Sequence, residues 1–234
     1  MRPRRALAVL HSASDVPGTL PEVLAELDIQ LQTRLVTDPL PPPEELEMVV
    51  VMGSPESAYD HRLPWLETEL NWLKRLVDAG VPTLGICFGS QLLARALGGS
   101  AVAAEEAEIG WTPVTAQATG WRHAGPWLNF HFDTFRLPEH VTLLADTDMA
   151  PQAFRHGSAW GVQFHPEITV GMFDIWLSDW RNSEEGRRFL DEAGDLPQRL
   201  RDEIALRQPD NYANFRRLMG DFLAAIEAPG KETT

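Results

Sequence analysis

The chain has 234 residues, of which 44% are hydrophobic and 23% are charged, so it is long enough for one globular domain, or one domain with an appendage. Its single cysteine excludes a framework of intramolecular disulfides and a zinc site with several cysteines, and weakly favours a reducing compartment. Its net charge of −14 disfavours binding to nucleic acid or to an anionic membrane.

The N-terminal segment contains the first predicted strand. Residues 6–10 form an apolar run that follows a basic start, and polar residues from His11 onward end the run. The run is too short for the apolar core of a signal peptide, and no stretch approaches the roughly 20 apolar residues of a membrane span. We therefore expect a buried strand here, and a cytoplasmic protein without a membrane association.

Strand-like and helix-like segments then alternate through the first part of the chain. Apolar runs that predict buried strands lie at residues 29–36, 48–52 and 82–87. Apolar residues at helical spacing predict helices around residues 20–27, 65–77 and 91–97. This alternation predicts an α/β fold with three layers, in which helices cover both faces of a mostly parallel central sheet.

The remainder of the chain has a different pattern. Between residues 100 and 165 no long helix is evident, and short strand-like segments lie at residues 101–104, 112–115, 127–135, 141–144 and 161–164. We expect an antiparallel or mixed region here, added to the parallel core. Helical patterning resumes after Pro166, and residues 181–234 are rich in charge. The sequence thus predicts a main domain at residues 1–180 and a C-terminal helical extension at 181–234, packed on the same domain.

The single cysteine lies in a pattern that is typical of a nucleophile. Residues 85–89 read Gly-Ile-Cys-Phe-Gly and separate a predicted strand from a predicted helix. Glycines two residues before and after Cys87 allow the sharp, strained turn of a nucleophile elbow. The free N–H groups and the dipole of the following helix favour a thiolate, and the N–H of Phe88 can stabilise an oxyanion.

A histidine that could act as the base follows the last predicted strand of the mixed region. His165 ends the apolar run at residues 161–164, which places it at the carboxyl end of a strand, where the sites of open α/β sheets gather. Glu167 lies two residues further on and could accept a hydrogen bond that fixes the tautomer of the imidazole. Because a thiolate needs a base and the base needs an orienting partner, we predict a Cys87–His165–Glu167 unit.

These two motifs resemble the class I, triad-type glutamine amidotransferase family, and its stand-alone, GMP-synthase-like branch in particular. The resemblance rests on residues 85–91 (GICFGSQ) and 161–167 (GVQFHPE), on their order and separation, and it covers about residues 6–180. It implies a flavodoxin-like catalytic domain that hydrolyses the side-chain amide of glutamine through a γ-glutamyl thioester. By this resemblance Cys87 is the nucleophile, His165 is the general base and acid, and Glu167 orients the histidine.

The resemblance also implies residues around the substrate. Gly53 matches a glycine whose N–H is a second donor to the oxyanion, although the residues on either side depart from the family's usual Gly-Gly-Pro. Gln91 matches a glutamine that holds the substrate. Further substrate-binding residues are expected in one short segment, namely Phe130, His131, Phe132 and Asp133, although many family members have glycine in place of Phe132. Residues 108–111 resemble a family segment near the pocket mouth, or else form an ordinary turn between strands.

No cofactor and no metal is expected. The spacing of histidine, aspartate and glutamate residues indicates no metal site, and the sequence has no phosphate-binding loop of the Gly-x-x-x-x-Gly-Lys type. The expected small-molecule partner is glutamine or another γ-glutamyl compound, and no nucleic-acid partner is expected.

The fate of the released ammonia leaves several functions open. The sequence has no motif of an ATP-dependent synthetase, so the ammonia would pass to a synthetase partner in trans. Alternatively, the same three residues could hydrolyse a γ-glutamyl amide or peptide without a partner. A catalytically silent binding or regulatory protein on this scaffold is a further alternative, which the retention of all three residue types disfavours. The His-Pro-Glu motif disfavours an unrelated cysteine hydrolase of the elbow type.

Overall fold

The computed structural model describes residues 2–227, without the side chain of residue 185. Its elements, in chain order, are β1 (Arg5–Leu10), α1 (Leu20–Glu26), β2 (Gln30–Leu35), the 3-10 helix η1 (Pro43–Glu45), β3 (Val49–Val51), α2 (Leu66–Asp78), β4 (Thr83–Ile86), α3 (Phe88–Ala96), β5 (Ser100–Thr112), β6 (Thr115–Ala116), β7 (Trp127–Arg136), β8 (Thr142–Asp146), β9 (Pro151–His156), β10 (Ala159–Val162), α4 (Val170–Asn182), α5 (Glu184–Ala193) and α6 (Leu196–Glu227). Residues 228–234, the end of the predicted extension, lie outside the described residues.

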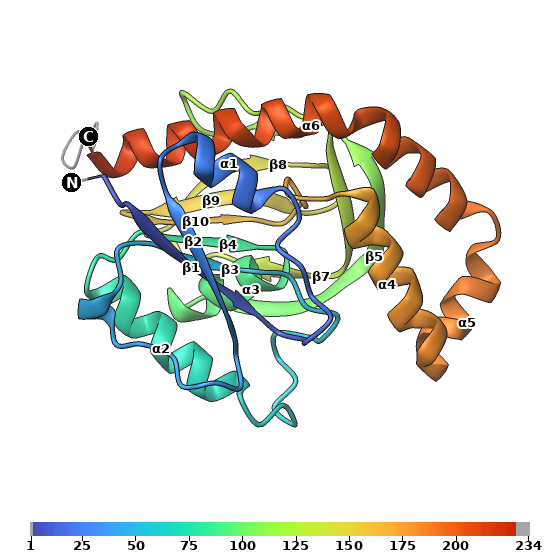
Figure 1. Cartoon of the computed structure of the whole chain (residues 1–234), viewed down its shortest axis with the longest axis horizontal. Coiled ribbons are helices and arrows are strands. Elements are labelled where there is room, and N and C mark those ends of the chain that lie inside the picture. The colour runs from blue at the N-terminus through green and yellow to red at the C-terminus, as the bar shows by residue number, and fades with distance from the viewer. Residues whose placement is uncertain (1, 228–234) are drawn as a thin grey trace.

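The central sheet has eight strands in the order β2-β1-β3-β4-β10-β9-β8-β6 (Figure 1). The strands from β2 to β10 run parallel to their neighbours, whereas β9, β8 and β6 each join the sheet in antiparallel pairing. β3 and β4 lie at the centre and are buried along their whole length, which explains their predominantly apolar sequences. The carboxyl ends of the parallel strands therefore meet at one edge of the sheet.

Helices cover both faces of this sheet (Figure 1). Val50 and Val51 are consecutive residues of β3, so their side chains point to opposite faces. Val50 packs in one apolar cluster with residues of α1 and α6 such as Phe222, and Val51 packs in another with residues of α2 and α3 such as Leu73. The predicted three-layer α/β fold with a mostly parallel sheet is thus confirmed.

The region between residues 100 and 165 differs from the prediction in two places. Residues 100–112 form one long strand, β5, which pairs with β7 in a separate antiparallel sheet, so the prediction of two short strands and of a turn at 108–111 is wrong. Exposed residues at a bulge between Ala103 and Glu108 interrupt the apolar alternation of β5. The sequence also missed β9, whose apolar core is only Ala153 and Phe154. Pairing with neighbouring strands, rather than a local alternation of apolar residues, therefore defines both β5 and β9.

Three helices follow the central sheet. α4 contributes to an apolar cluster with β7 and the start of α6, and α6 then lies along the sheet and buries Phe215, Leu218 and Phe222. The predicted C-terminal helical extension is confirmed, whereas the boundary at residue 180 remains a prediction and falls within α4. Among residues 2–227, no helix combines the length and the apolar character needed to cross a membrane.

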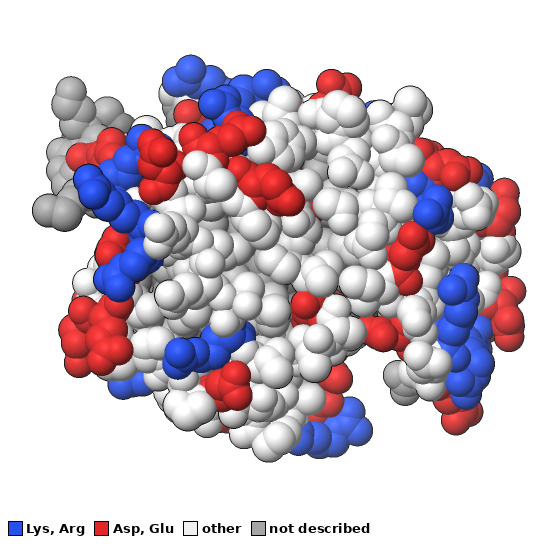
Figure 2. All heavy atoms as spheres, in the orientation of Figure 1, with Lys and Arg blue, Asp and Glu red and all other residues white. Residues whose placement is uncertain are grey.

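Charged side chains on the face shown in Figure 2 lie mainly around the rim, with acidic and basic groups intermixed. Uncharged residues occupy the centre of this face. The described residues therefore present no continuous basic surface on this side, in keeping with the net charge of −14.

Candidate active site

The predicted nucleophile lies at the junction between β4 and α3. Cys87 has a φ of 51°, a left-handed conformation that strains any residue with a side chain. A Cβ atom on Gly85 would lie 2.5 Å from the carbonyl oxygen of Gly89, and one on Gly89 would lie 2.1 Å from that of Val51. Only glycine fits at both positions. α3 begins at Phe88, so the positive end of its dipole lies at the thiol-bearing residue.

His165 and Glu167 form a buried pair shortly after β10. Nδ1 of His165 lies 2.9 Å from Oε1 of Glu167, and the two side chains are 4% and 0% exposed. Backbone hydrogen bonds fix the segment, because the N–H of His165 donates to Leu128 and the carbonyl of Glu167 accepts from the N–H of Thr19, both at 2.8 Å. A carboxylate can only accept, so Nδ1 donates and Nε2 is the nitrogen left to exchange a proton.

Gly53 follows β3 and brings a third strand end to the same place. A Cβ atom on Gly53 would lie 3.2 Å from Cε1 of His165 and 3.8 Å from Cβ of Cys87. The three residues follow the carboxyl ends of β3, β4 and β10, which is where open α/β sheets build their sites. The structure thus brings the predicted nucleophile, base and oxyanion donor together.

The surroundings of His165 favour its protonated form. Burial lowers the pKa of this imidazole, but the charges of Cys87 and Glu167 and the hydrogen bonds to both raise it to about 10. The buried imidazole of His165 therefore lies between the sulfur of Cys87 and the carboxylate of Glu167.

The sequence analysis missed two residues that touch this pair. Nε2 of Gln163 donates to Sγ of Cys87 at 3.6 Å, and the ring of Trp176 in α4 lies 4.8 Å from the ring of His165. Gln163 lies directly after β10 and two residues before His165, and this proximity to His165 in the sequence was the available signal. Trp176 has only helical spacing, which does not separate a site contact from ordinary helix packing.

Gln91 is linked to Cys87 by way of the Gln163 side chain, which hydrogen-bonds to both residues. Nε2 of Gln91 donates to the carbonyl oxygen of Asp133 at 3.1 Å and to Oε1 of Gln163 at 3.3 Å. Gln91 is buried, and its side chain links α3 to β7. Substrate binding by Gln91 remains a prediction.

The predicted substrate-binding segment on β7 presents alternate residues to opposite sides. Phe130 and Phe132 lie on one side with ring centroids 5.9 Å apart, and both contact the ring of Phe189 in α5. Phe130 is buried, whereas Phe132 is 50% exposed. This side of the segment therefore forms an aromatic surface that is open to solvent at Phe132.

The other two residues of the segment make polar contacts. His131 is buried, and its Nε2 lies 3.3 Å from Oε2 of Glu108 in β5. The carboxylate of Asp133 accepts hydrogen bonds from Ser57 at 2.6 Å and from Tyr59 at 2.9 Å. These contacts tie β7 to β5 and to the loop after β3, while the predicted contacts to substrate remain predictions.

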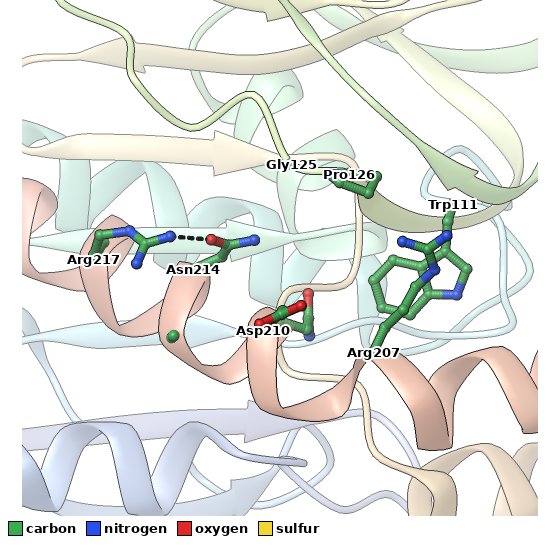
Figure 3. Close-up of a pocket in the computed structure, with 9 residues that line it drawn as sticks. Trp111, Gly125, Pro126, Arg207, Asp210, Asn214 and Arg217 are labelled. Atoms are coloured by element: carbon green, nitrogen blue, oxygen red, sulfur yellow. Dashed lines mark hydrogen bonds between the residues drawn. The ribbon is translucent and has the colours of Figure 1, made fainter.

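A cavity of about 330 Å³ lies beside α6 (Figure 3). The guanidinium of Arg207 lies 5.5 Å from the ring centre of Trp111 on its wall, and Cys87, His165 and Glu167 do not line it. Within residues 2–227, no group of three or more histidine, cysteine, aspartate or glutamate side chains is placed to hold a metal ion.

The sequence also matches a known protein family. The profile of the family described as glutamine amidotransferase class-I matches residues 16–178, more than half of the chain. The protein therefore belongs to the class I glutamine amidotransferase family.

Individual relatives point the same way. The chain is 30% identical over 178 residues to the glutamine amidotransferase-like protein YfeJ of Salmonella typhimurium, an alignment that covers 67% of this chain and 73% of YfeJ. It is 33% identical over 129 residues to the glutamine-hydrolysing GMP synthase of Clostridium perfringens, which covers 51% of this chain and 24% of the synthase. The chain thus spans about a quarter of the length of that synthase.

Solved structures show the same fold over nearly the whole chain. A glutamine amidotransferase from Thermotoga maritima superimposes with a TM-score of 0.80 at 25% identity, covering 94% of this chain and 97% of that one. A glutamine amidotransferase from Methylobacillus flagellatus superimposes with a TM-score of 0.81, also at 25% identity, covering 100% and 99%. The C-terminal helices are therefore included in the similarity.

Proposed function

We propose that this protein hydrolyses the side-chain amide of glutamine to glutamate and ammonia, with Cys87 as the nucleophile. Family membership supports glutamine hydrolysis in general. The observation that carries the specific proposal is the meeting of Cys87, His165 and Gly53, in which the glycine lies against both catalytic side chains. An elbow thiol, a paired histidine and a backbone donor at one point are the groups that acyl transfer needs.

The first half of the proposed reaction forms a thioester. The Cys87 thiolate attacks the amide carbon, a carbon–sulfur bond forms, and the electron pair of the C=O bond moves to oxygen. The N–H groups of Gly53 and Phe88 stabilise that oxyanion. His165 then gives its proton to the amide nitrogen, the C–N bond breaks, and ammonia leaves.

The second half hydrolyses the thioester. His165 is now neutral and takes a proton from water as the water oxygen attacks the thioester carbon. The tetrahedral intermediate collapses, the carbon–sulfur bond breaks, and glutamate leaves with the Cys87 thiolate and the imidazolium restored. Glu167 holds the ring through Nδ1 in both halves, so that Nε2 always faces the reacting atoms.

The proposal also covers which residues bind the substrate and where the released ammonia goes. Gln91 and the segment of Phe130, His131, Phe132 and Asp133 hold the glutamine within a catalytic domain at residues 1–180. The ammonia passes to a synthetase partner in trans.

A γ-glutamyl amide or peptide is the second candidate substrate, and Phe132 favours it. The half-exposed ring of Phe132 continues an aromatic surface toward solvent. A leaving amine larger than ammonia could pack on such a surface, whereas glutamine alone would not need it. The three catalytic residues would act in the same way on either substrate.

Comparing the wild-type protein with Cys87→Ser tests the proposal. Each is supplied with glutamine or with a set of γ-glutamyl amines, and ammonia and glutamate are measured. We expect Cys87→Ser to lose turnover by at least about 10⁴-fold, because the serine hydroxyl is not ionised at neutral pH and is a much weaker nucleophile than a thiolate. An electrophilic glutamine analogue should label the wild-type protein and not the variant.

The outcomes separate the candidate functions. Full activity in a correctly folded Cys87→Ser protein would overturn the mechanism. Turnover of glutamine that appears only with a second protein supports the partner in trans, and rapid cleavage of a γ-glutamyl amine alone supports the second candidate. Absence of both turnover and labelling in the wild type would favour a silent protein on this scaffold.

A further inference from the structure

Another buried histidine–glutamate pair lies behind the proposed oxyanion site. His11 follows β1 directly, and its Nε2 lies 3.2 Å from each carboxylate oxygen of Glu69 in α2. Both side chains are 0% exposed. Nδ1 of the same imidazole lies 3.0 Å from the carbonyl oxygen of Gly53. Neither residue stands out in the sequence as a partner of the other, because they are 58 positions apart.

The same imidazole also touches the other predicted oxyanion donor. The ring of His11 meets the ring of Phe88 edge to face, with centroids 4.6 Å apart, and the ring of Trp65 lies 5.3 Å from His11 and 5.8 Å from Phe88. One buried side chain therefore contacts Gly53, shortly after β3, and Phe88, the residue after Cys87. These are the two residues whose N–H groups are proposed to stabilise the oxyanion.

The contacts of His11 determine where its protons lie. The carbonyl oxygen of Gly53 can only accept, so Nδ1 must carry a proton. The oxygens of an ionised Glu69 also only accept, so Nε2 must carry one as well. Burial lowers the pKa of His11, but the charge of Glu69 and the hydrogen bonds to Glu69 and Gly53 raise this pKa more. The charge of Asp15, whose carboxylate accepts a hydrogen bond from the backbone N–H of His11 at 3.1 Å, adds to the increase.

We propose that His11 and Glu69 are positioning residues that hold Gly53 and Phe88 in place as the two oxyanion donors. This inference rests on the proposed function. Glycine has the widest backbone freedom of any residue, so Gly53, near the start of the loop after β3, needs an external anchor to keep its N–H aimed. The Nδ1–H of His11 supplies that anchor at the Gly53 carbonyl, and Glu69 fixes the ring from the opposite nitrogen.

Two substitutions of His11 separate anchoring from simple packing. An asparagine amide ends near the position of Nδ1 and can still donate to Gly53, whereas a glutamine amide reaches toward Nε2. We expect His11→Gln to lower kcat by about 10- to 100-fold, a part of the cost of deleting one oxyanion donor, with little change in KM. His11→Asn should recover most of that loss. Glu69→Gln, which keeps the size but not the charge, should lie between the two.

Alkylation of Cys87 by iodoacetamide gives the second readout. Sulfur displaces iodide from a saturated carbon in this reaction, so no oxyanion forms. We expect the alkylation rate of His11→Gln to stay within about twofold of wild type while its turnover falls. The control is His123→Gln, because His123 is also buried and paired with a carboxylate, Asp221 at 3.1 Å, but has no contact with the site.

The results distinguish this inference from the proposed function. Wild-type turnover in His11→Gln and Glu69→Gln would overturn the inference and leave the function intact. A parallel loss of turnover and alkylation would also overturn it, because the effect would then lie in the thiol or in the fold. A wild-type protein that is alkylated but turns over neither glutamine nor γ-glutamyl amines, with or without a synthetase partner, would overturn the proposed function, and the inference with it.

Discussion

At the scale of single residues, the carboxylate of Glu167 in the proposed catalytic unit uses only one of its two oxygens to hydrogen-bond with the described residues. Its Oε1 contacts Nδ1 of His165, while Oε2 is buried and has no hydrogen-bond partner among the described residues. The hydrogen bond that orients the imidazole from Nδ1 thus depends on one of the two carboxylate oxygens. Because water is excluded from both side chains, the charge of Glu167 acts on His165 with little screening.

Replacing Glu167 with glutamine removes the charge and keeps the size. We expect kcat to fall by about 10- to 100-fold, the usual cost of losing the partner that orients a histidine. His165→Ala should be more severe, at about 10³-fold or more, because both proton transfers are lost. Steady-state kinetics of the two variants provide the measurement. A Glu167→Gln protein that is more impaired than His165→Ala would contradict the orienting role.

The same variant has an expected pH signature. His165 has a folded pKa of about 10, above its ordinary value of 6.5, so its ionic contribution to stability is fully present below pH 6.5 and is lost as the pH rises toward 10. In Glu167→Gln one of the charges that raise this pKa is gone, so the loss should occur at lower pH. Urea unfolding at several pH values between 6 and 10 measures the shift, and identical profiles would argue against the ion pair.

At the scale of elements, the close approach of β3 to α3 sets the position of the nucleophile. Gly89 in the first turn of α3 leaves no room for a side chain, because a Cβ atom would lie 2.1 Å from the carbonyl oxygen of Val51 and 3.0 Å from its Cβ. The strand and the helix are therefore in backbone contact. This contact fixes where Cys87 lies relative to Gly53, two residues beyond Val51.

Gly89→Ala should separate these two elements. Alanine is the better helix former, so any loss of stability reports the clash rather than the helix. We expect the free energy of unfolding to fall by about 1–3 kcal/mol, as for other overpacked sites, together with most of the turnover. Gly220→Ala is the matched control, since a Cβ there meets no atom within 4 Å and α6 should become more stable. Denaturant unfolding of both variants checks this, and equal stabilities would contradict the clash.

What the sequence could predict depends on how local each signal is. Buried parallel strands such as β3 carry continuous apolar runs, and Cys87 and His165 lie in short motifs, so these features are visible in a few residues. β9 was missed because its burial comes from β10 and β8 on either side of it. Glu69 was missed because a glutamate on a helix normally faces solvent, and only the folded chain brings His11 to it.

At the scale of the whole molecule, the C-terminal helix α6 contacts the loop that carries His165 and Glu167. Nδ2 of Asn211 donates to the carbonyl oxygen of Pro166 at 2.8 Å, between His165 and Glu167. Asn211 is 2% exposed and lines the α6 cavity, as does the half-buried Asn214, which is labelled in Figure 3. The long helix thus does more than cover an apolar face, because it holds the backbone on which the base and its partner lie.

Asn211→Ala should therefore weaken both the fold and the catalytic loop. Loss of a buried hydrogen bond, with the Pro166 carbonyl left behind, should lower the free energy of unfolding by about 1–3 kcal/mol. Asn214→Ala removes a similar side chain from the same helix, one that pairs only with Arg217, and should change stability by less than about 0.5 kcal/mol. Urea unfolding gives the stabilities, and amide hydrogen exchange should quicken at His165 and Glu167 in Asn211→Ala alone. Equal losses of stability in both variants, or unchanged hydrogen exchange at His165 and Glu167, would contradict the role of Asn211 in holding this loop.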